Sequence, residues 1–213
     1  MPSVHLILDL DGTSSDPSVG ILRSINYALE SFGYPSVSES RISAYIGPPV
    51  DQTYRTLTRT ASEEHLAALV RKFRERYADV GYSENMLYPG VVDALQTLWQ
   101  AGARLGLCTS KRVDFAEKIL SMFGLRGNFE FVSGGDVGVA KASQLSELLR
   151  EGLAAQGSTM IGDRAIDMLA AKANGLQCIG VLWGHRSESE LIGAGADRVM
   201  SDPLQLGSLA GAV

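Results

Sequence analysis

Short apolar runs alternate with helical patterns along most of the chain. The runs lack the regular apolar–polar alternation of half-exposed strands, which is typical of strands buried on both faces of a sheet. The predicted strands are 4–10, 103–108, 129–132, 159–161, 178–182 and 198–200, and the predicted helices between them are 90–101, 113–123, 141–154 and 165–173. This alternation predicts an α/β fold with a doubly wound, Rossmann-like parallel sheet.

A stretch of helices without strands interrupts the alternation directly after the first strand. Apolar residues recur there at the three- and four-residue spacing of amphipathic helices. One stripe is Val19, Leu22, Ile25, Leu29 and Phe32, and a second is Leu66, Leu69, Val70, Phe73 and Tyr77. The flanking segments 13–17 and 82–90 are polar and contain proline or glycine, as linkers do. We therefore expect an α/β core domain of residues 1–14 and 87–213 and an inserted α-helical domain of residues 15–86.

Composition and charge narrow the class of protein. The chain has 213 residues, of which 45% are hydrophobic and 20% charged, and a net charge of −5 without a basic block makes a nucleic-acid polymer an unexpected partner. The sequence shows neither a secretion signal nor a long apolar span, so we expect no membrane association. Cys108 and Cys178 lie in apolar runs and are expected to be buried, reduced thiols. These features predict a cytoplasmic protein.

The residues that follow the predicted strands carry most of the candidate chemistry. The carboxyl ends of parallel strands form one edge of a sheet, and ligands bind at that edge. The four segments are Asp9-Leu10-Asp11-Gly12-Thr13, Thr109-Ser110-Lys111-Arg112, Ser133-Gly134-Gly135-Asp136 with Lys141 shortly after, and Gly162-Asp163-Arg164 with Asp167. We expect their acids, hydroxyls and lysine to converge in one site.

The acids of this edge predict a magnesium site. Asp9 and Asp163 follow different strands and offer hard oxygen ligands, without clustered histidine or cysteine, which favours Mg²⁺. Asp167 lies four residues after Asp163 on the opening turn of a predicted helix, so we expect the two side chains to share one face of that helix. A divalent cation would offset the repulsion among these carboxylates.

Asp9 and Asp11 together suit a two-step transfer of a phosphoryl group. One carboxylate can attack phosphorus, and its neighbour can protonate the leaving alcohol and then take a proton from the attacking water. We assign the first role to Asp9 and the second to Asp11. Gly12 permits the tight turn and a close approach of phosphate to the backbone.

These segments resemble the four signature motifs of the haloacid dehalogenase superfamily of phosphatases, nearly from end to end of the chain. The matching strings are DLDGT at 9–13, LCTSK around Thr109, Lys141, and GDRAID with Asp163 and Asp167. The resemblance implies that Asp9 is the nucleophile and a metal ligand, and that Asp11 is the acid/base with its carbonyl on the metal. It further implies that Thr109 and Lys141 bind phosphate, aided by Gly12, Thr13, Ser110 and Lys111. Asp163 would be a metal ligand, with Asp167 in or directly behind that shell.

Three further strings resemble the phosphoglycolate-phosphatase-like branch, in particular its 5′-nucleotidase-like members. They are SINYALESFGYP, YIGPPV and IGVLWGHRSESELIGAGAD, and the helical insert resembles the C1 cap of that branch. The resemblance implies a Mg²⁺-dependent phosphomonoester hydrolase that forms an aspartyl phosphate. Its substrate would be a small phosphorylated metabolite, phosphoglycolate or a nucleoside 5′-monophosphate, and the protein would be a monomer or homodimer. The chain departs from its relatives at residues 14–17, which read Ser-Ser-Asp-Pro, and at Ala142, where a proline is common.

Several alternatives remain open from the sequence alone. A phosphomutase of the β-phosphoglucomutase type would use the same acids, and a receiver-type phospho-acceptor or a non-catalytic binding module would also place acids on a parallel sheet. The large insert and the DGT turn disfavour a receiver. Arg74 in the insert either contacts a substrate anion or extends along the apolar stripe into solvent. His185 follows the fifth strand at the functional edge and is interpreted as a loop histidine.

Overall fold

The computed structural model describes residues 5–135 and 139–211 and divides the chain into two compact units. One unit comprises Met1–Asp16 and Leu87–Val213, and the other comprises Pro17–Met86. Val4 of the first predicted strand and Asp136 of the predicted edge lie outside the described residues. Within the described ranges, no helix is long and apolar enough to cross a membrane.

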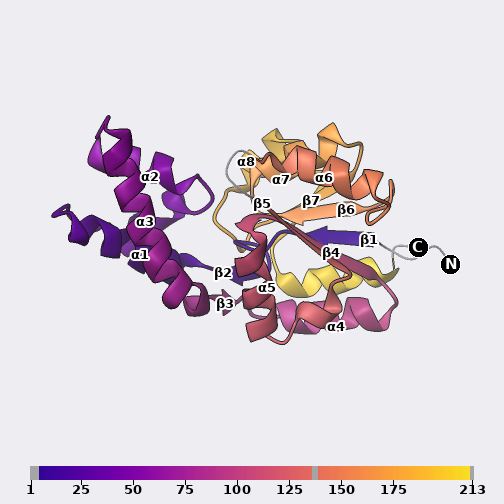
Figure 1. Ribbon diagram of the computed structural model, residues 1–213. Helices are drawn as coiled ribbons and strands as arrows, with labels where there is room; N and C mark the ends of the chain where they lie inside the picture. The colour runs from indigo at the N-terminus through magenta and orange to yellow at the C-terminus, as the bar shows by residue number, and fades with distance from the viewer. Residues whose placement is uncertain (1–4, 136–138, 212–213) are drawn as a thin grey trace. The chain divides into compact units, whose positions relative to one another are not determined.

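A six-stranded parallel sheet forms the centre of the first unit (Figure 1). Its strands are β1 (His5–Leu8), β4 (Arg104–Arg112), β5 (Phe131–Gly135), β6 (Thr159–Gly162), β7 (Gln177–Val181) and β8 (Arg198–Met200). Their order is β5-β4-β1-β6-β7-β8, and every neighbouring pair is parallel. The α/β prediction is confirmed. Because β1 lies between β4 and β6, the carboxyl ends of these three strands are neighbours at the switch point of the sheet.

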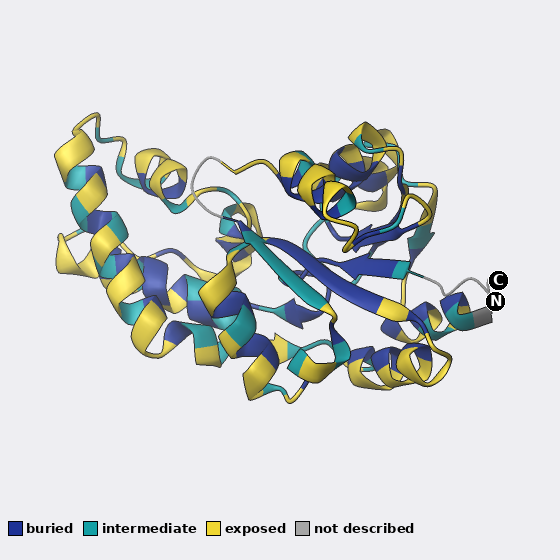
Figure 2. Cartoon of the chain, turned by 45° about the vertical axis from the view of Figure 1, so that its right-hand side comes forward, coloured by how far each residue is buried: buried dark blue, intermediate teal, exposed yellow. Residues whose placement is uncertain are grey.

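Helices cover both faces of the sheet (Figure 1). On one face lie α4 (Val91–Gln100), α5 (Val113–Met122) and the 3₁₀ helix η4 (Pro203–Gly211), and on the other lie α6 (Lys141–Arg150), α7 (Ala165–Ala173) and α8 (Glu188–Gly193). The central strands are buried along most of their length (Figure 2). On the α6–α7 face the core includes Ile7, Cys108, Met160, Cys178, Leu145, Leu148 and Met168. Both cysteines are free and buried, as predicted.

The second strand along this sheet extends farther than its sequence pattern indicates. We predicted a strand at 103–108, whereas β4 continues to Arg112. Its pairing with β5 shifts in register between Thr109 and Arg112, so the last residues form an irregular, bulged end. The polar residues Thr109, Ser110 and Lys111 therefore belong to the strand itself rather than to a loop after it.

The second unit is helical, as its apolar spacing predicts. It contains α1 (Ser18–Ser31), η1 (Glu39–Tyr45), α2 (Val50–Thr58), α3 (Glu63–Asp79) and η2 (Gly81–Glu84). Most residues of the two predicted stripes are buried, but Phe32 lies beyond the end of α1 and is 38% exposed. A two-stranded sheet of β2 (Ser15–Asp16) and β3 (Met86–Leu87) forms where the chain passes between the units, and the sequence did not predict it.

Helix α1 and the segment after α3 approach closely at a pair of glycines. A Cβ atom on Gly20 would lie 2.0 Å from the carbonyl oxygen of Gly81. The contact is backbone to backbone, so neither side can move by a side-chain rotation. Ser24, one turn after Gly20, is buried in the same region and donates its hydroxyl to the Gly20 carbonyl.

We expect Gly20→Ala to destabilise the helical unit although alanine is the better helix former. The methyl group must displace the Gly81 backbone, and overpacking of this kind costs about 1–3 kcal/mol. Gly193→Ala in α8 is the matched control, because a Cβ atom there meets nothing within 4 Å. Thermal unfolding followed by circular dichroism should show a lower midpoint for Gly20→Ala and an unchanged or slightly higher one for Gly193→Ala. Equal midpoints for the two variants would contradict this interpretation.

Candidate active site

Asp9 stands at the end of the central strand and is held there by its backbone. Its N–H donates to the Ile161 carbonyl of β6 at 2.9 Å, which continues the strand pairing by one residue. Its own carbonyl accepts a hydrogen bond from the Ser14 hydroxyl at 2.8 Å. The residue is only 4% exposed. These bonds fix the direction of a buried carboxylate on a rigid element.

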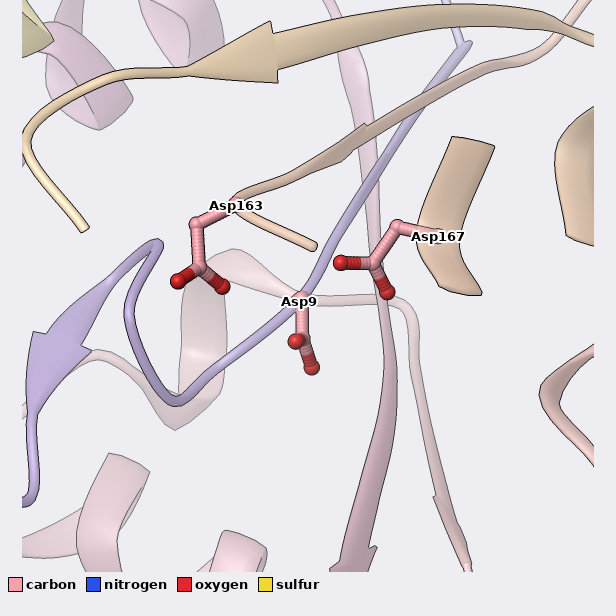
Figure 3. A group of neighbouring side chains, drawn as sticks. All are labelled: Asp9, Asp163 and Asp167. Carbon is pink, nitrogen blue, oxygen red and sulfur yellow. The ribbon is translucent and has the colours of Figure 1, made fainter. Parts of the chain in front are cut away.

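Three carboxylates converge at this point, as the strand order predicts. Asp9, Asp163 and Asp167 each provide an oxygen within 4.8 Å of the others, and all three residues are buried (Figure 3). Figure 3 shows them arriving from separate segments, one after β1, one after β6 and one on α7. Residues more than 150 positions apart in the sequence thus share one small volume.

The arrangement of Asp163 and Asp167 differs from the expected shared helix face. Helix α7 begins at Ala165 with Arg164 as its N-cap, so Asp163 lies in the turn before the helix and only Asp167 is helical. The Asp167 side chain accepts a hydrogen bond from the Arg164 N–H at 3.0 Å and thereby caps the helix. Asp163 accepts instead from the His185 N–H at 2.9 Å. The two carboxylates meet because the turn bends, and not because four residues complete a helical turn.

Lys141 supplies a positive charge to this cluster. It begins α6, it is 1% exposed, and its Nζ lies 3.1 Å from Asp9 Oδ1 while it also donates to Asp167 Oδ1. Burial alone would lower the pKa of the Lys141 ammonium, but the charges of Asp167 and Asp9 raise it, so the group is charged at neutral pH. The substitution at Ala142 therefore leaves the lysine in contact with both acids.

Asp11 points to a different partner from Asp9. Its Oδ2 atom lies 2.8 Å from the Lys111 Nζ. Burial raises the pKa of the Asp11 carboxyl, and the Lys111 ammonium partly offsets that rise. The Asp11 side chain is outside the three-acid group. The contact with the metal that the resemblance implies is through the Asp11 backbone carbonyl, and it stays a prediction. A carboxyl group with a raised pKa can carry a proton, as a general acid requires.

The other predicted site residues of the α/β unit lie around the same edge. Thr109 is buried, its carbonyl accepts from Gln144 Nε2 at 3.2 Å, and its hydroxyl oxygen accepts from the Lys111 N–H at 3.3 Å. Ser110 is exposed on the bulged end of β4. The Thr13 hydroxyl is buried and has no hydrogen-bond partner among the described residues. Arg74 is exposed on α3 in the helical unit, and its role in substrate binding stays a prediction.

Two glycines allow Asp163 to approach the turn after β1. Gly12 has a φ of +82°, and a Cβ atom there would lie 2.3 Å from Asp163 Oδ2. A Cβ atom on Gly184 would lie 2.4 Å from the Asp163 Cβ. Any larger residue at either position would push the Asp163 carboxylate away. The DGT turn therefore needs glycine both for its backbone conformation and for the space it leaves.

The acid cluster fits a divalent cation. Oδ1 of Asp163 is buried and lacks a hydrogen-bond partner among the described residues, and Oδ1 of Asp9 is buried with the Lys141 Nζ 3.1 Å away. Burial is the main cause that raises the pKa of Asp163 to about 7, the charges of Asp9 and Asp167 add to it, and the hydrogen bond from His185 opposes it. Asp9, Asp163 and Asp167 offer oxygen atoms only, the donor type that Mg²⁺ prefers. The three carboxylates are thus the residues able to hold such an ion.

Trp183 and Gly184 belong to this site and were missed as site residues. The Trp183 indole N–H donates to the Thr13 carbonyl at 2.9 Å, and Gly184 packs against Gly12 and Asp163. The sequence does place both after a predicted strand, at the functional edge of the sheet. A signal was therefore present, but an indole and a glycine carry no titratable chemistry and were not considered as partners of the first turn.

Comparisons with known proteins point to one family. The model of the haloacid dehalogenase-like hydrolase family matches residues 6–181. A 5′-nucleotidase of Pseudomonas aeruginosa is 36% identical over 88% of this chain and 86% of its own, and a phosphoglycolate phosphatase of Yersinia pestis is 34% identical over 83% and 80%. A solved haloacid dehalogenase-like hydrolase of Streptococcus pneumoniae has a TM-score of 0.87 at 25% identity, and 97% of each chain is covered.

We expect Asp163→Asn to stabilise the metal-free protein above neutral pH. Because the folded pKa of Asp163 lies above the unfolded value of 3.8, its stabilising contribution is complete below pH 3.8 and is lost as the pH rises through about 7. In EDTA at pH 8 the variant should unfold roughly 5 °C above the wild type, and the gap should narrow towards pH 5. Thermal melts at both pH values measure this difference.

The same melts with Mg²⁺ in place of EDTA provide the second arm. Bound Mg²⁺ should raise the wild-type midpoint at pH 8 and should have little effect on Asp163→Asn, because the variant lacks one carboxylate of the cluster. A metal-free variant that unfolds below the wild type at pH 8 would show that Asp163 is stabilising as a charge and would overturn this electrostatic account.

Proposed function

The chain belongs to the haloacid dehalogenase-like hydrolase family, and from that membership we propose that it is a Mg²⁺-dependent phosphomonoester hydrolase. The observation that carries the proposal is the buried Asp9 carboxylate, which lies beside Lys141 and within reach of Asp163 and Asp167. A carboxylate so placed can act as a nucleophile only if the negative charge of phosphate is balanced nearby. Lys141 provides part of that balance.

The proposed reaction has two steps on the side chains of one turn. An Asp9 oxygen attacks phosphorus, the bond from phosphorus to the substrate oxygen breaks, and Asp11 gives its proton to the departing alcohol. Asp11 then takes a proton from water, the hydroxide oxygen attacks phosphorus, and the bond to Asp9 breaks to release inorganic phosphate. The raised pKa of Asp11 and its ion pair with Lys111 support a group that alternates between the two protonation states.

Mg²⁺ would be held by Asp9, Asp163 and Asp167, with the Asp11 carbonyl as the further ligand that the family resemblance implies. When bound, the ion would supply positive charge opposite the phosphate oxygens. Thr109 would bind phosphate through its buried hydroxyl, beside the Gly12–Thr13 turn. Ser110 and Lys111 lie at the same strand end and complete the proposed phosphate site.

The substrate is proposed to be a small phosphorylated metabolite. The two relatives described above are named for phosphoglycolate and for 5′-nucleotides, so these two compounds are the first candidates. The helical unit, residues 17–86, is proposed as a cap that selects among leaving groups and excludes water, with Arg74 as a candidate contact for a substrate anion. A phosphomutase would use the same acids and remains the alternative reaction.

We expect Asp9→Asn to lose at least ~10³-fold in kcat on p-nitrophenyl phosphate with Mg²⁺, because an amide oxygen is a far weaker nucleophile than a carboxylate. Asp93→Asn, on an exposed turn of α4, is the matched control and should keep wild-type kcat. Steady-state release of inorganic phosphate measures both. Wild-type turnover by Asp9→Asn would show that the nucleophile has been assigned wrongly.

A substrate panel should separate hydrolase from mutase. We expect phosphate release from phosphoglycolate or a nucleoside 5′-monophosphate, with kcat/KM at least about 10-fold above that for sugar phosphates, since discrimination by a closed site reaches this size. β-Glucose 1-phosphate is assayed in parallel for isomerisation to the 6-phosphate. Isomerisation without phosphate release would replace the hydrolase proposal by the mutase.

A further inference from the structure

The segment after β7 contacts both halves of the candidate active site. Trp183 reaches the turn after β1, and His185 reaches Asp163, the acid that follows β6. Between them, a Cβ atom on Gly184 would lie 2.3 Å from the Gly12 carbonyl oxygen and 2.4 Å from the Asp163 Cβ, so only glycine fits there. Three consecutive residues therefore touch the turn that carries Asp11 and the neighbouring carboxylate. We name residues 183–185 the bracing loop.

The Trp183 hydrogen bond joins segments 170 positions apart in the sequence. The indole N–H can only donate, and it donates to the carbonyl oxygen of Thr13 at 2.9 Å. Thr13 is 1% exposed, so water has little access to that carbonyl. Without the indole N–H a buried backbone acceptor would lose this partner, and such groups are costly to leave unpaired.

The backbone hydrogen bonds of this turn are local, apart from one that the Ser14 carbonyl accepts from the Tyr88 N–H at 3.4 Å. The N–H groups of Thr13, Ser14 and Ser15 donate to the Leu10 carbonyl, and the Gly12 N–H donates to Ser15. These bonds shape the turn but do not tie it to the far side of the sheet. The indole of Trp183 makes that tie at Thr13, two residues after Asp11.

The bracing loop is itself anchored by strand β7 and by its bond to Asp163. Leu182 continues the pairing of β7 with its N–H on the Met200 carbonyl at 2.9 Å. The His185 N–H holds Asp163 at 2.9 Å. The indole therefore extends from a segment that is fixed at both ends, which gives the Thr13 carbonyl a defined position.

We propose that Trp183 is a positioning residue that fixes the Asp11–Thr13 turn for proton transfer to the leaving group. The inference rests on the proposed function of Asp11 as general acid and assigns to the indole the placement of that acid. Proton transfer requires heavy atoms within hydrogen-bond reach, so a small displacement of the turn lowers its rate steeply. The effect should depend on how much the leaving group needs a proton.

Two substrates distinguish positioning from a general structural role. A nitrophenolate can leave without a proton, whereas an alkoxide from an alkyl phosphate needs one. Trp183→Phe should therefore lower kcat about 10-fold or more on an alkyl phosphate and less than about 3-fold on p-nitrophenyl phosphate. Asp11→Asn should also lose more kcat on the alkyl phosphate than on p-nitrophenyl phosphate, and the difference between the two losses should be larger than for Trp183→Phe. Trp99→Phe is the matched control, because Trp99 is 58% exposed on α4.

Amide hydrogen exchange provides a readout that needs no activity. In the metal-free proteins, the segment 10–15 should exchange at least about 10-fold faster in Trp183→Phe than in wild type and in Trp99→Phe. A second variant carries benzothienylalanine at 183 in a Trp99→Phe background, where sulfur replaces the indole N–H at nearly the same volume. This variant should reproduce the faster exchange and the selective loss of kcat on the alkyl phosphate. Because its ring is nearly as large as indole, a smaller side chain cannot be the cause.

The outcomes separate the inference from the function on which it rests. Selective loss on the alkyl phosphate together with faster exchange in segment 10–15 supports the positioning role. Equal losses on both substrates, or unchanged exchange in the benzothienylalanine variant, would overturn it. If the wild type turns over neither substrate, the proposed hydrolase function fails. The exchange measurement then tests the inference alone: a wild-type exchange rate of segment 10–15 in both variants would overturn the positioning role of Trp183.

Discussion

The burial of three carboxylates around one ammonium is the constraint on which the site depends. Asp9, Asp163 and Asp167 share a volume in which their charges repel, and Lys141 balances only part of the excess. Isolated charges are expensive to remove from water, so such a group persists only if hydrogen bonds or a counter-ion offset the cost. The His185 and Arg164 N–H groups, each on one acid, supply such bonds. Burial is the main cause of the raised pKa of Asp163, and the remaining negative charge adds to it. That charge also explains the fit to a divalent cation.

The topology of the sheet makes this crowding possible. The central position of β1 places its carboxyl end between those of β4 and β6, so the acid after β1 has hydroxyls on one side and a second acid on the other. Glycine at 12 and at 184 then removes the side-chain volume that would separate the turns. The result is a set of functional groups fixed by backbone pairing, with little dependence on flexible loops.

The local sequence pattern was enough to predict the parallel sheet, the residues at the functional edge of that sheet, and the helical insert. Asp9 and Asp163 could be placed because each follows an apolar strand, and strand ends meet at one edge whatever the details of the turns. The end of β4 could not be placed, because Thr109, Ser110 and Lys111 are polar and their pairing is set by the bulge against β5. The Asp163 side chain is held by a residue more than 20 positions away, and the indole bond to Thr13 spans more than 150 positions. Spacing along the chain does not encode such contacts.

The pairing of β1 has a consequence for how the protein is made. This strand is synthesised before its partners β4 and β6, which begin about 100 and 150 residues later in the chain. Until both have been synthesised, the apolar strand His5–Leu8 lacks its neighbours in the sheet. The helical insert lies within that interval, and its helices are local in sequence, so it can fold before the sheet is complete. The three-acid cluster can therefore form only after the chain has been made as far as Asp167.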